Sequence, residues 1–104
     1  MWFSACLLFE NVGQSRPISE NIWEERIVLF RAANDDEAKQ RALAIGVSAQ
    51  HKYVAANGES IDCQFRQVER IVELATEQVD DETEVFSRFL RYSEVQSLLT
   101  PFPD

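Results

Sequence analysis

Apolar and polar positions alternate along two early segments of the chain, and each alternation predicts a strand. In residues 2–9 both sets of alternating positions are largely apolar, so we expect a strand that is covered on both faces. Residues 22–33 are rich in β-branched and aromatic side chains and contain no Gly or Pro, which is typical of a long strand. The loop at 11–21 between these segments favours an antiparallel hairpin.

The apolar spacing becomes helical after residue 33. Asn34 is followed three positions later by Glu37, which is the pattern of a helix capping box. Small and aliphatic residues then repeat on one stripe: Ala38, Ala42, Ile45 and Ala49. We expect a helix that passes through Gly46 and continues to about His51, although Gly46 also allows an earlier end. The small side chains predict a close approach between this helix and the sheet.

A turn signal and a change of phase organise the next strands. Asn57-Gly58 is a strong turn dipeptide, and it predicts a hairpin that joins a short strand at 53–55 to a long strand at 59–75. The apolar alternation in the long strand changes phase near Arg66, which indicates a β-bulge or a bend. These two strands are therefore expected to be antiparallel neighbours.

The C-terminal part of the chain predicts one more strand and one more helix. After an acidic turn, we expect a strand at 85–91 and a short helix at 93–99 with Ser93 as its N-cap. Prolines occupy two of the last four positions, which predicts that residues 101–104 form a tail.

The predicted element order is ββαβββα, which defines an α+β fold in a single domain over residues 1–100. We expect an antiparallel sheet of four to five strands with one main helix on one face. One helix cannot cover both faces of such a sheet, yet Trp2, Leu8 and Trp23 direct apolar side chains toward the second face. Either the sheet curls on itself or a second copy covers this face, and we hypothesise a homodimer.

The acidic balance of the chain narrows the classes of partner. The 104 residues carry a formal net charge of -8 at pH 7, which disfavours binding to nucleic acid or to an anionic membrane surface. No apolar run reaches the roughly 18 residues that a membrane span needs. A basic or neutral protein partner fits this charge, although acidity also serves solubility alone.

Two cysteines, Cys6 and Cys63, both fall in apolar strand contexts, as small buried side chains do. The apolar N-terminus lacks the basic segment of an export signal, so we expect a cytoplasmic protein with reduced thiols. A disulfide between the two cysteines is the less favoured alternative.

Sequence motifs for catalysis, metals and cofactors are missing from the chain. His51 is the single histidine, and no Cys-x-x-Cys or His-Glu-x-x-His spacing occurs, so we expect no bound metal. Three isolated glycines form no phosphate-binding loop, and we expect no cofactor. The balance favours a protein without enzyme activity.

The candidates for function are polar residues that stand within or beside the predicted strands: Glu24, Glu25, Tyr53, Arg66 and Arg88. Opposite charges across neighbouring strands commonly do no more than stabilise a sheet. In the functional interpretation these residues form a polar pocket, in which Arg88 binds an anionic group and Glu24 or Glu25 acts as a hydrogen-bond acceptor or base.

Several short segments, taken in their order and spacing, carry a resemblance to a known family. They are Trp2-Phe3-Ser4-Ala5, Leu7-Leu8-Phe9-Glu10, Trp23 to Leu29, Glu37-Ala38 with Ala42, Tyr53, Asn57-Gly58-Glu59 and Thr83 to Leu90. The chain resembles, to about Leu99, a small bacterial family known only as domain of unknown function 4288. The resemblance implies a short stand-alone bacterial protein, and it implies no reaction, cofactor or partner.

Two functions from different classes follow. The first is a non-enzymatic interaction module that homodimerises and binds a protein partner through a sheet face or edge. The second is a small-ligand-binding protein or an enzyme whose pocket is lined by the charged strand residues. The surplus apolar sheet surface and the missing catalytic motifs favour the first.

Overall fold

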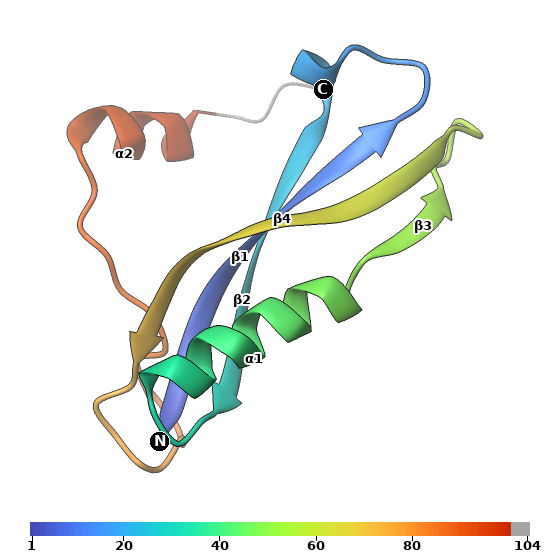
Figure 1. Ribbon diagram of the computed structural model, residues 1–104. Helices are drawn as coiled ribbons and strands as arrows, with labels where there is room; N and C mark the ends of the chain where they lie inside the picture. The colour runs from blue at the N-terminus through green and yellow to red at the C-terminus, as the bar shows by residue number, and fades with distance from the viewer. Residues whose placement is uncertain (101–104) are drawn as a thin grey trace.

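The computed structural model describes residues 1–100 and confirms the α+β class (Figure 1). Its elements follow the chain in this order: β1 (Trp2–Gly13), a short 3-10 helix η1 (Ile18–Glu20), β2 (Ile22–Arg31), α1 (Asp35–Ser48), β3 (His51–Val54), β4 (Ser60–Glu73) and α2 (Tyr92–Leu99). Within the described residues the four strands form one antiparallel sheet in the order β2-β1-β4-β3. The strands β2 and β3 are therefore its edges.

The predicted hairpins are both present. β1 and β2 pair from Trp2 opposite Arg31 to Asn11 opposite Ile22. β1 extends to Gly13, beyond the predicted end at residue 9, and β2 ends at Arg31, two residues before the predicted end at residue 33. β3 and β4 are joined through the Asn57-Gly58 turn, where Gly58 has a φ of 86° that favours glycine.

The predicted change of phase in β4 is confirmed as two β-bulges. Glu69 and Arg66 have no partner in the pairing of β4 with β1, so each is the extra residue of one bulge in β4. As a result Phe65, Val68 and Ile71, which are spaced by three, all reach the same core.

The helix α1 begins as the sequence predicts. The Asn34 side chain accepts a hydrogen bond of 2.8 Å from the backbone N–H of Glu37. The helix continues through Gly46 and ends at Ser48, three residues before the predicted His51. Gly46 is buried so closely against β4 that a Cβ atom there would lie 2.5 Å from the ring of Phe65.

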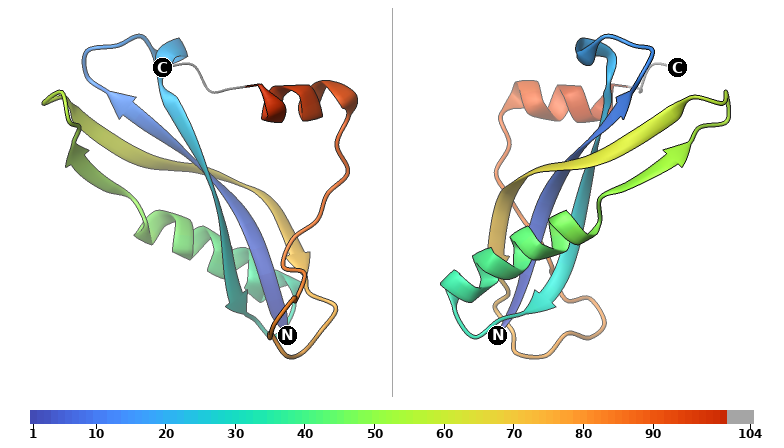
Figure 2. Two further views of the ribbon diagram at one scale, coloured as in Figure 1. Left: turned by 180° about the vertical axis from the view of Figure 1, so that it is seen from behind. Right: turned by 45° about the vertical axis from the view of Figure 1, so that its right-hand side comes forward.

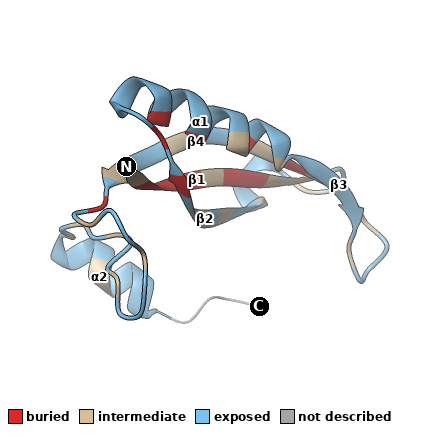
Figure 3. Cartoon of the chain, turned by 90° about the horizontal axis from the view of Figure 1, so that it is seen from below, coloured by how far each residue is buried: buried red, intermediate tan, exposed pale blue. Residues whose placement is uncertain are grey.

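The sheet has two different faces, which we name for what covers them (Figure 3). On the helix face, the alternate β1 residues from Phe3 to Phe9 are buried beneath Ala38 and Ala42 of α1 and beside Phe30 of β2. The open face carries the other alternate residues of β1, which start at Trp2, and the β2 residues that pair with them. Within residues 1–100, the segment after β4 and α2 lie on this side of the sheet.

Two expectations for the C-terminal part are wrong. The segment 85–91 is not a strand, so the element order is ββαββα rather than ββαβββα. Its Arg88 reaches residues of both β2 and β4, so the segment lies over the open face and not in the plane of the sheet, where a strand would pair. The helix α2 begins at Tyr92, one residue before the predicted start. Its N-cap is Arg91, two residues before the predicted Ser93, because the Glu94 carboxylate accepts a hydrogen bond from the Arg91 backbone N–H. The predicted tail at 101–104 lies outside the described residues.

Candidate functional site

The predicted site residues fall into two groups that the sheet separates. Glu24 pairs with Phe9, and Tyr53 lies on the same side of β3, so both belong to the helix face. Glu25, Arg66 and Arg88 lie on the open face, where their partners also lie. The structure therefore brings Glu25 and Arg88 together and keeps them apart from Glu24 and Tyr53.

Arg88 spans the open face between two strands. Its guanidinium lies 3.7 Å from the Glu25 carboxylate on β2 and 3.8 Å from the Glu69 carboxylate on β4. Glu69 is one of the two bulged residues of β4, and the bulge sets its position beside β1. This bridge fastens the segment after β4 across β1, and the two carboxylates offset the positive charge of Arg88 that would attract another anion.

Cys6 lies beneath this bridge and is fully buried. Burial raises the pKa of its thiol to about 12, and the neighbouring Glu25 carboxylate adds to the rise. A thiol with such a pKa stays protonated at neutral pH, so it is a poor nucleophile. Cys6 is a packing residue of the open face.

Arg66 forms a second ion pair on the open face. Its Nε lies 2.9 Å from a carboxylate oxygen of Glu10, whose other oxygen accepts a hydrogen bond of 2.8 Å from the Asn21 amide. These bonds, first that from Asn21 and then that from Arg66, lower the pKa of Glu10. Through Glu10, the last part of β1 is therefore linked to Arg66 on β4 and to Asn21 in the loop before β2.

Glu24 is paired with Arg26 on the helix face, beyond the end of α1. Two hydrogen bonds of 2.8 and 3.1 Å join the Arg26 guanidinium to the Glu24 carboxylate, and the bond from Arg26 lowers the pKa of Glu24. The same guanidinium lies 4.4 Å above the ring of Phe9 and 3.8 Å from the sulfur of Cys63. Arg26 thus covers the part of the core that α1 does not reach.

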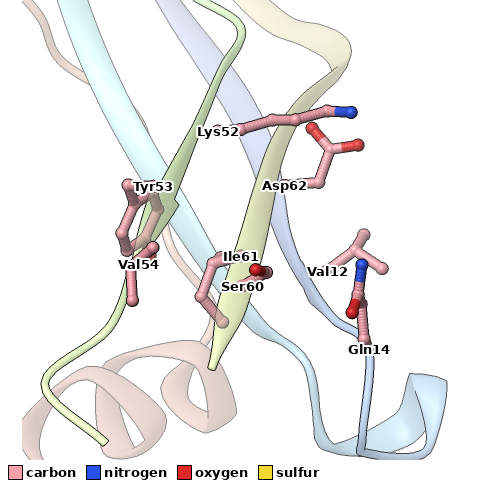
Figure 4. Close-up of a pocket in the computed structure, with 8 residues that line it drawn as sticks. All are labelled: Val12, Gln14, Lys52, Tyr53, Val54, Ser60, Ile61 and Asp62. Atoms are coloured by element: carbon pink, nitrogen blue, oxygen red, sulfur yellow. The ribbon is translucent and has the colours of Figure 1, made fainter. Parts of the chain in front are cut away.

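Tyr53 lines a pocket of about 380 Å³ between β3 and the ends of β1 and β4 (Figure 4). Its hydroxyl donates a hydrogen bond of 3.2 Å to Asn11, and its ring stacks on His51 at 5.5 Å between centroids. Lys52 and Asp62 supply opposite charges at the same pocket. Of the five predicted site residues, Tyr53 is the one that lines it.

An apolar patch lies on β2 at the open face. We define the open-face patch as Trp23, Ile27 and Leu29, which are 52, 46 and 39% exposed. Their neighbours along the strand on the helix face, including Val28 and Phe30, are partly or fully buried. The patch adjoins the free edge of β2, and exposed apolar groups of this kind commonly mark a contact surface.

Sequence reasoning did not identify Glu10 and Glu69 as the partners of Arg66 and Arg88. Arg26 is not among the predicted site residues, although its place two positions after Glu24 in one strand puts both side chains on the same face. Glu10 and Glu69 gave no signal, because their pairing with Arg66 and Arg88 depends on the bulges in β4. Alternation alone cannot place a residue that follows a bulge.

Metal-ligand clusters and membrane-spanning helices are both absent from residues 1–100. Within residues 1–100, no three His, Cys, Asp or Glu side chains are grouped so that they would hold a metal ion. In the same part of the chain, no helix has both the length and the apolar character needed to cross a bilayer.

Fold and site together define a small α+β protein in which the charged candidates Glu24, Glu25, Arg66 and Arg88 are engaged in ion pairs. Its second sheet face carries an apolar patch. The chain belongs to the family described as Domain of unknown function (DUF4288), whose family model matches residues 2–87. The resemblance noted in the sequence is thereby confirmed, with a match that ends before the expected Leu99. No curated protein and no solved structure matches the chain.

Proposed function

We propose that this protein is a non-enzymatic interaction module that forms a homodimer through the open face of its sheet and also binds a protein partner. The observation that carries the proposal is the open-face patch, in which Ile27 and Leu29 remain 46 and 39% exposed on a strand whose other face is packed against the core. A second copy is the simplest partner for such a face, because one symmetric contact covers the patches of both chains.

The charges of the site support a structural rather than a catalytic role. Arg88, Arg66 and Glu24 each have an oppositely charged partner within the chain. Cys6 and Cys63 are both buried, and burial raises the pKa of each thiol. Groups that are paired or protonated in this way are poorly suited to act as bases or nucleophiles.

The net charge of -8 favours a basic or neutral protein as the further partner. We place the module in the cytoplasm, a proposal supported by its two cysteines, which are free thiols as expected in a reducing compartment.

The test is the mass of the full chain in solution. Sedimentation velocity or light scattering at micromolar concentration is expected to give twice the chain mass and a return toward the single mass on dilution. A single-chain mass at every concentration would exclude the homodimer. Affinity capture from an extract of the native host, with this protein as the bait, is expected to recover a basic or neutral protein. The same capture at high salt is expected to recover less of it, because salt screens the attraction between the charges.

A second candidate function rests on the pocket beside Tyr53. Its volume of about 380 Å³ is within the range of small-ligand sites, and Lys52 and Asp62 offer opposite charges to a small zwitterionic or polar molecule. A ligand bound there is expected to shift the NMR signals of Lys52 and Tyr53 in wild type. No shift in these signals across a set of polar metabolites would leave the pocket as a surface feature.

A further inference from the structure

The helix α2 exposes apolar side chains that nothing within the described chain covers. None of its eight residues is buried, and Tyr92, Leu98 and Leu99 are 79, 64 and 73% exposed. Phe89, in the approach to the helix, is fully exposed at 103%. A helix of two turns is only marginally stable alone in water. Its stability therefore calls for a surface against which these side chains are buried.

The segment between β4 and α2 is held against the sheet at Arg88 and is not held after it. Arg88 holds it across the sheet through Glu25 and Glu69, and beyond Arg88 it leaves the sheet (Figure 2). We call residues 89–99 the C-terminal arm. Two views agree that α2 stands apart from its own sheet, on the side of the open face. The family match ends at residue 87, so this arm lies beyond it.

The charge of the arm differs from that of the rest of the chain. The arm, residues 89–99, contains Arg91 and Glu94 and so has no net charge, whereas residues 1–88 contain sixteen acidic and nine basic side chains. Two acidic bodies repel one another, but an arm without net charge packs on another copy with little of this repulsion. Its exposed apolar side chains match the apolar patch on the body of another copy.

We propose that the C-terminal arm of each copy packs on the open-face patch of a second copy, so that the two arms are exchanged across a twofold axis. This inference rests on the proposed homodimer and names the segment that makes its contact. Phe89, Leu98 and Leu99 supply the apolar groups of the arm, and Ile27 and Leu29 supply those of the receiving face. The exchange covers both unpartnered surfaces of each chain in one symmetric contact.

Cross-linking tests which chain each arm touches. Leu29→Cys and Leu98→Cys are combined in one full-length chain and treated with a short bis-maleimide. The native thiols do not interfere, because Cys6 and Cys63 are buried. The expected product is a covalent dimer, and an equimolar mixture of the two single variants is expected to give a mixed dimer. A cross-link within a single chain would show that the arm covers its own sheet and would overturn the proposal.

A charge placed on the arm separates this inference from the homodimer itself. Leu98→Asp is expected to raise the dimer Kd by about 100-fold, because each dimer loses two arm contacts. Val47→Asp adds the same charge at a 58% exposed position of α1 and is expected to leave the Kd unchanged. If Leu98→Asp does not weaken the dimer, the arm exchange is overturned but the homodimer stands. The two copies would then associate in another way, such as by pairing along their β2 edges. A wild-type chain that stays a monomer would overturn both. Circular dichroism of each variant confirms that the fold is kept, since no residue of α2 contributes to the core.

Discussion

Truncating the open-face patch gives the sharpest test of the proposed dimer. The double variant Ile27→Ala, Leu29→Ala removes apolar groups that are 46 and 39% exposed in the single chain. Full burial of one such side chain stabilises by about 1.5–3 kcal/mol, so the part still available to a partner is worth about 0.6–1.4 kcal/mol for each residue. Both residues occur in both copies, so the variant is expected to lose about 2–4 kcal/mol of association free energy after allowance for what Ala retains.

This loss corresponds to a dimer Kd raised about 30- to 900-fold. Sedimentation velocity over a range of concentrations measures it directly. The matched control is Leu43→Ala, Val47→Ala, which truncates two α1 residues that are 51 and 58% exposed and is expected to leave the Kd unchanged. An equal Kd for the patch variant and the wild type would refute the assignment of the open face as the contact. Equal weakening by the control would show that apolar exposure in general, rather than this face, drives association.

Three further predictions follow from the packing and the ionisable groups. Gly46→Val forces a side chain against the ring of Phe65, where a Cβ would lie only 2.5 Å away, and is expected to cost about 1–3 kcal/mol in urea unfolding. Ala44→Val, at an exposed position of the same helix, is expected to cost only about 0.5 kcal/mol, and equal costs would contradict the close contact. The bond from Arg26 lowers the pKa of Glu24 below its ordinary 4.5, so the ion pair stabilises the fold above that pH and loses its effect as the pH falls through the folded-state pKa. The thermal midpoint of the wild type is therefore expected to fall more steeply between neutral and acid pH than that of Glu24→Gln, and parallel curves would exclude a role for the pair. Cys6, whose pKa is raised to about 12, is expected to react with a thiol reagent at pH 8 only at the rate of unfolding. Because the folded-state pKa of Cys6 is raised above the unfolded-state value of 9.0, the contribution of this thiol to the free energy of unfolding is fully present below pH 9.0. This contribution is lost as the pH rises from 9.0 toward the folded-state pKa. Rapid labelling of native protein would contradict the burial of this thiol.

Local signals in the sequence were sufficient for most of the elements. Asn34 capped the predicted helix, the small stripe of Ala38 and Ala42 met the sheet, and Gly58 took the left-handed conformation that its turn requires. Each of these signals is contained in a short stretch of sequence, although the alanine stripe acts by packing on distant strands. The bulge near Arg66 was also foreseeable, because a bulge shifts the phase of apolar residues along the strand.

The segment 85–91 shows where such signals fail. Its alternation of apolar and polar residues is that of a strand, yet a strand forms only where a neighbouring edge can complete its hydrogen bonds. The ion pairs of Arg88 with Glu25 and Glu69 hold this segment over the open face, above the strands rather than in line with an edge. The local pattern does not contain that information, because the partners of Arg88 lie on two distant strands.

Patterns in the amino-acid sequence were enough to predict the class of the fold, the hairpins, the cap and packing stripe of α1, and the surplus of apolar sheet surface. Strand alternation also places Glu24 and Glu25, adjacent in the chain, on opposite faces. The packed structure was needed to decide that Glu25 pairs with Arg88 from a distant segment, whereas Glu24 pairs with Arg26. It also decided that Cys6 lies beneath the Arg88 bridge, and that the arm after Arg88 stands free of its own sheet. The physical reason is that hydrophobic periodicity and capping act within a few residues, whereas strand register, bulge pairing and long-range ion pairs depend on which distant segments meet.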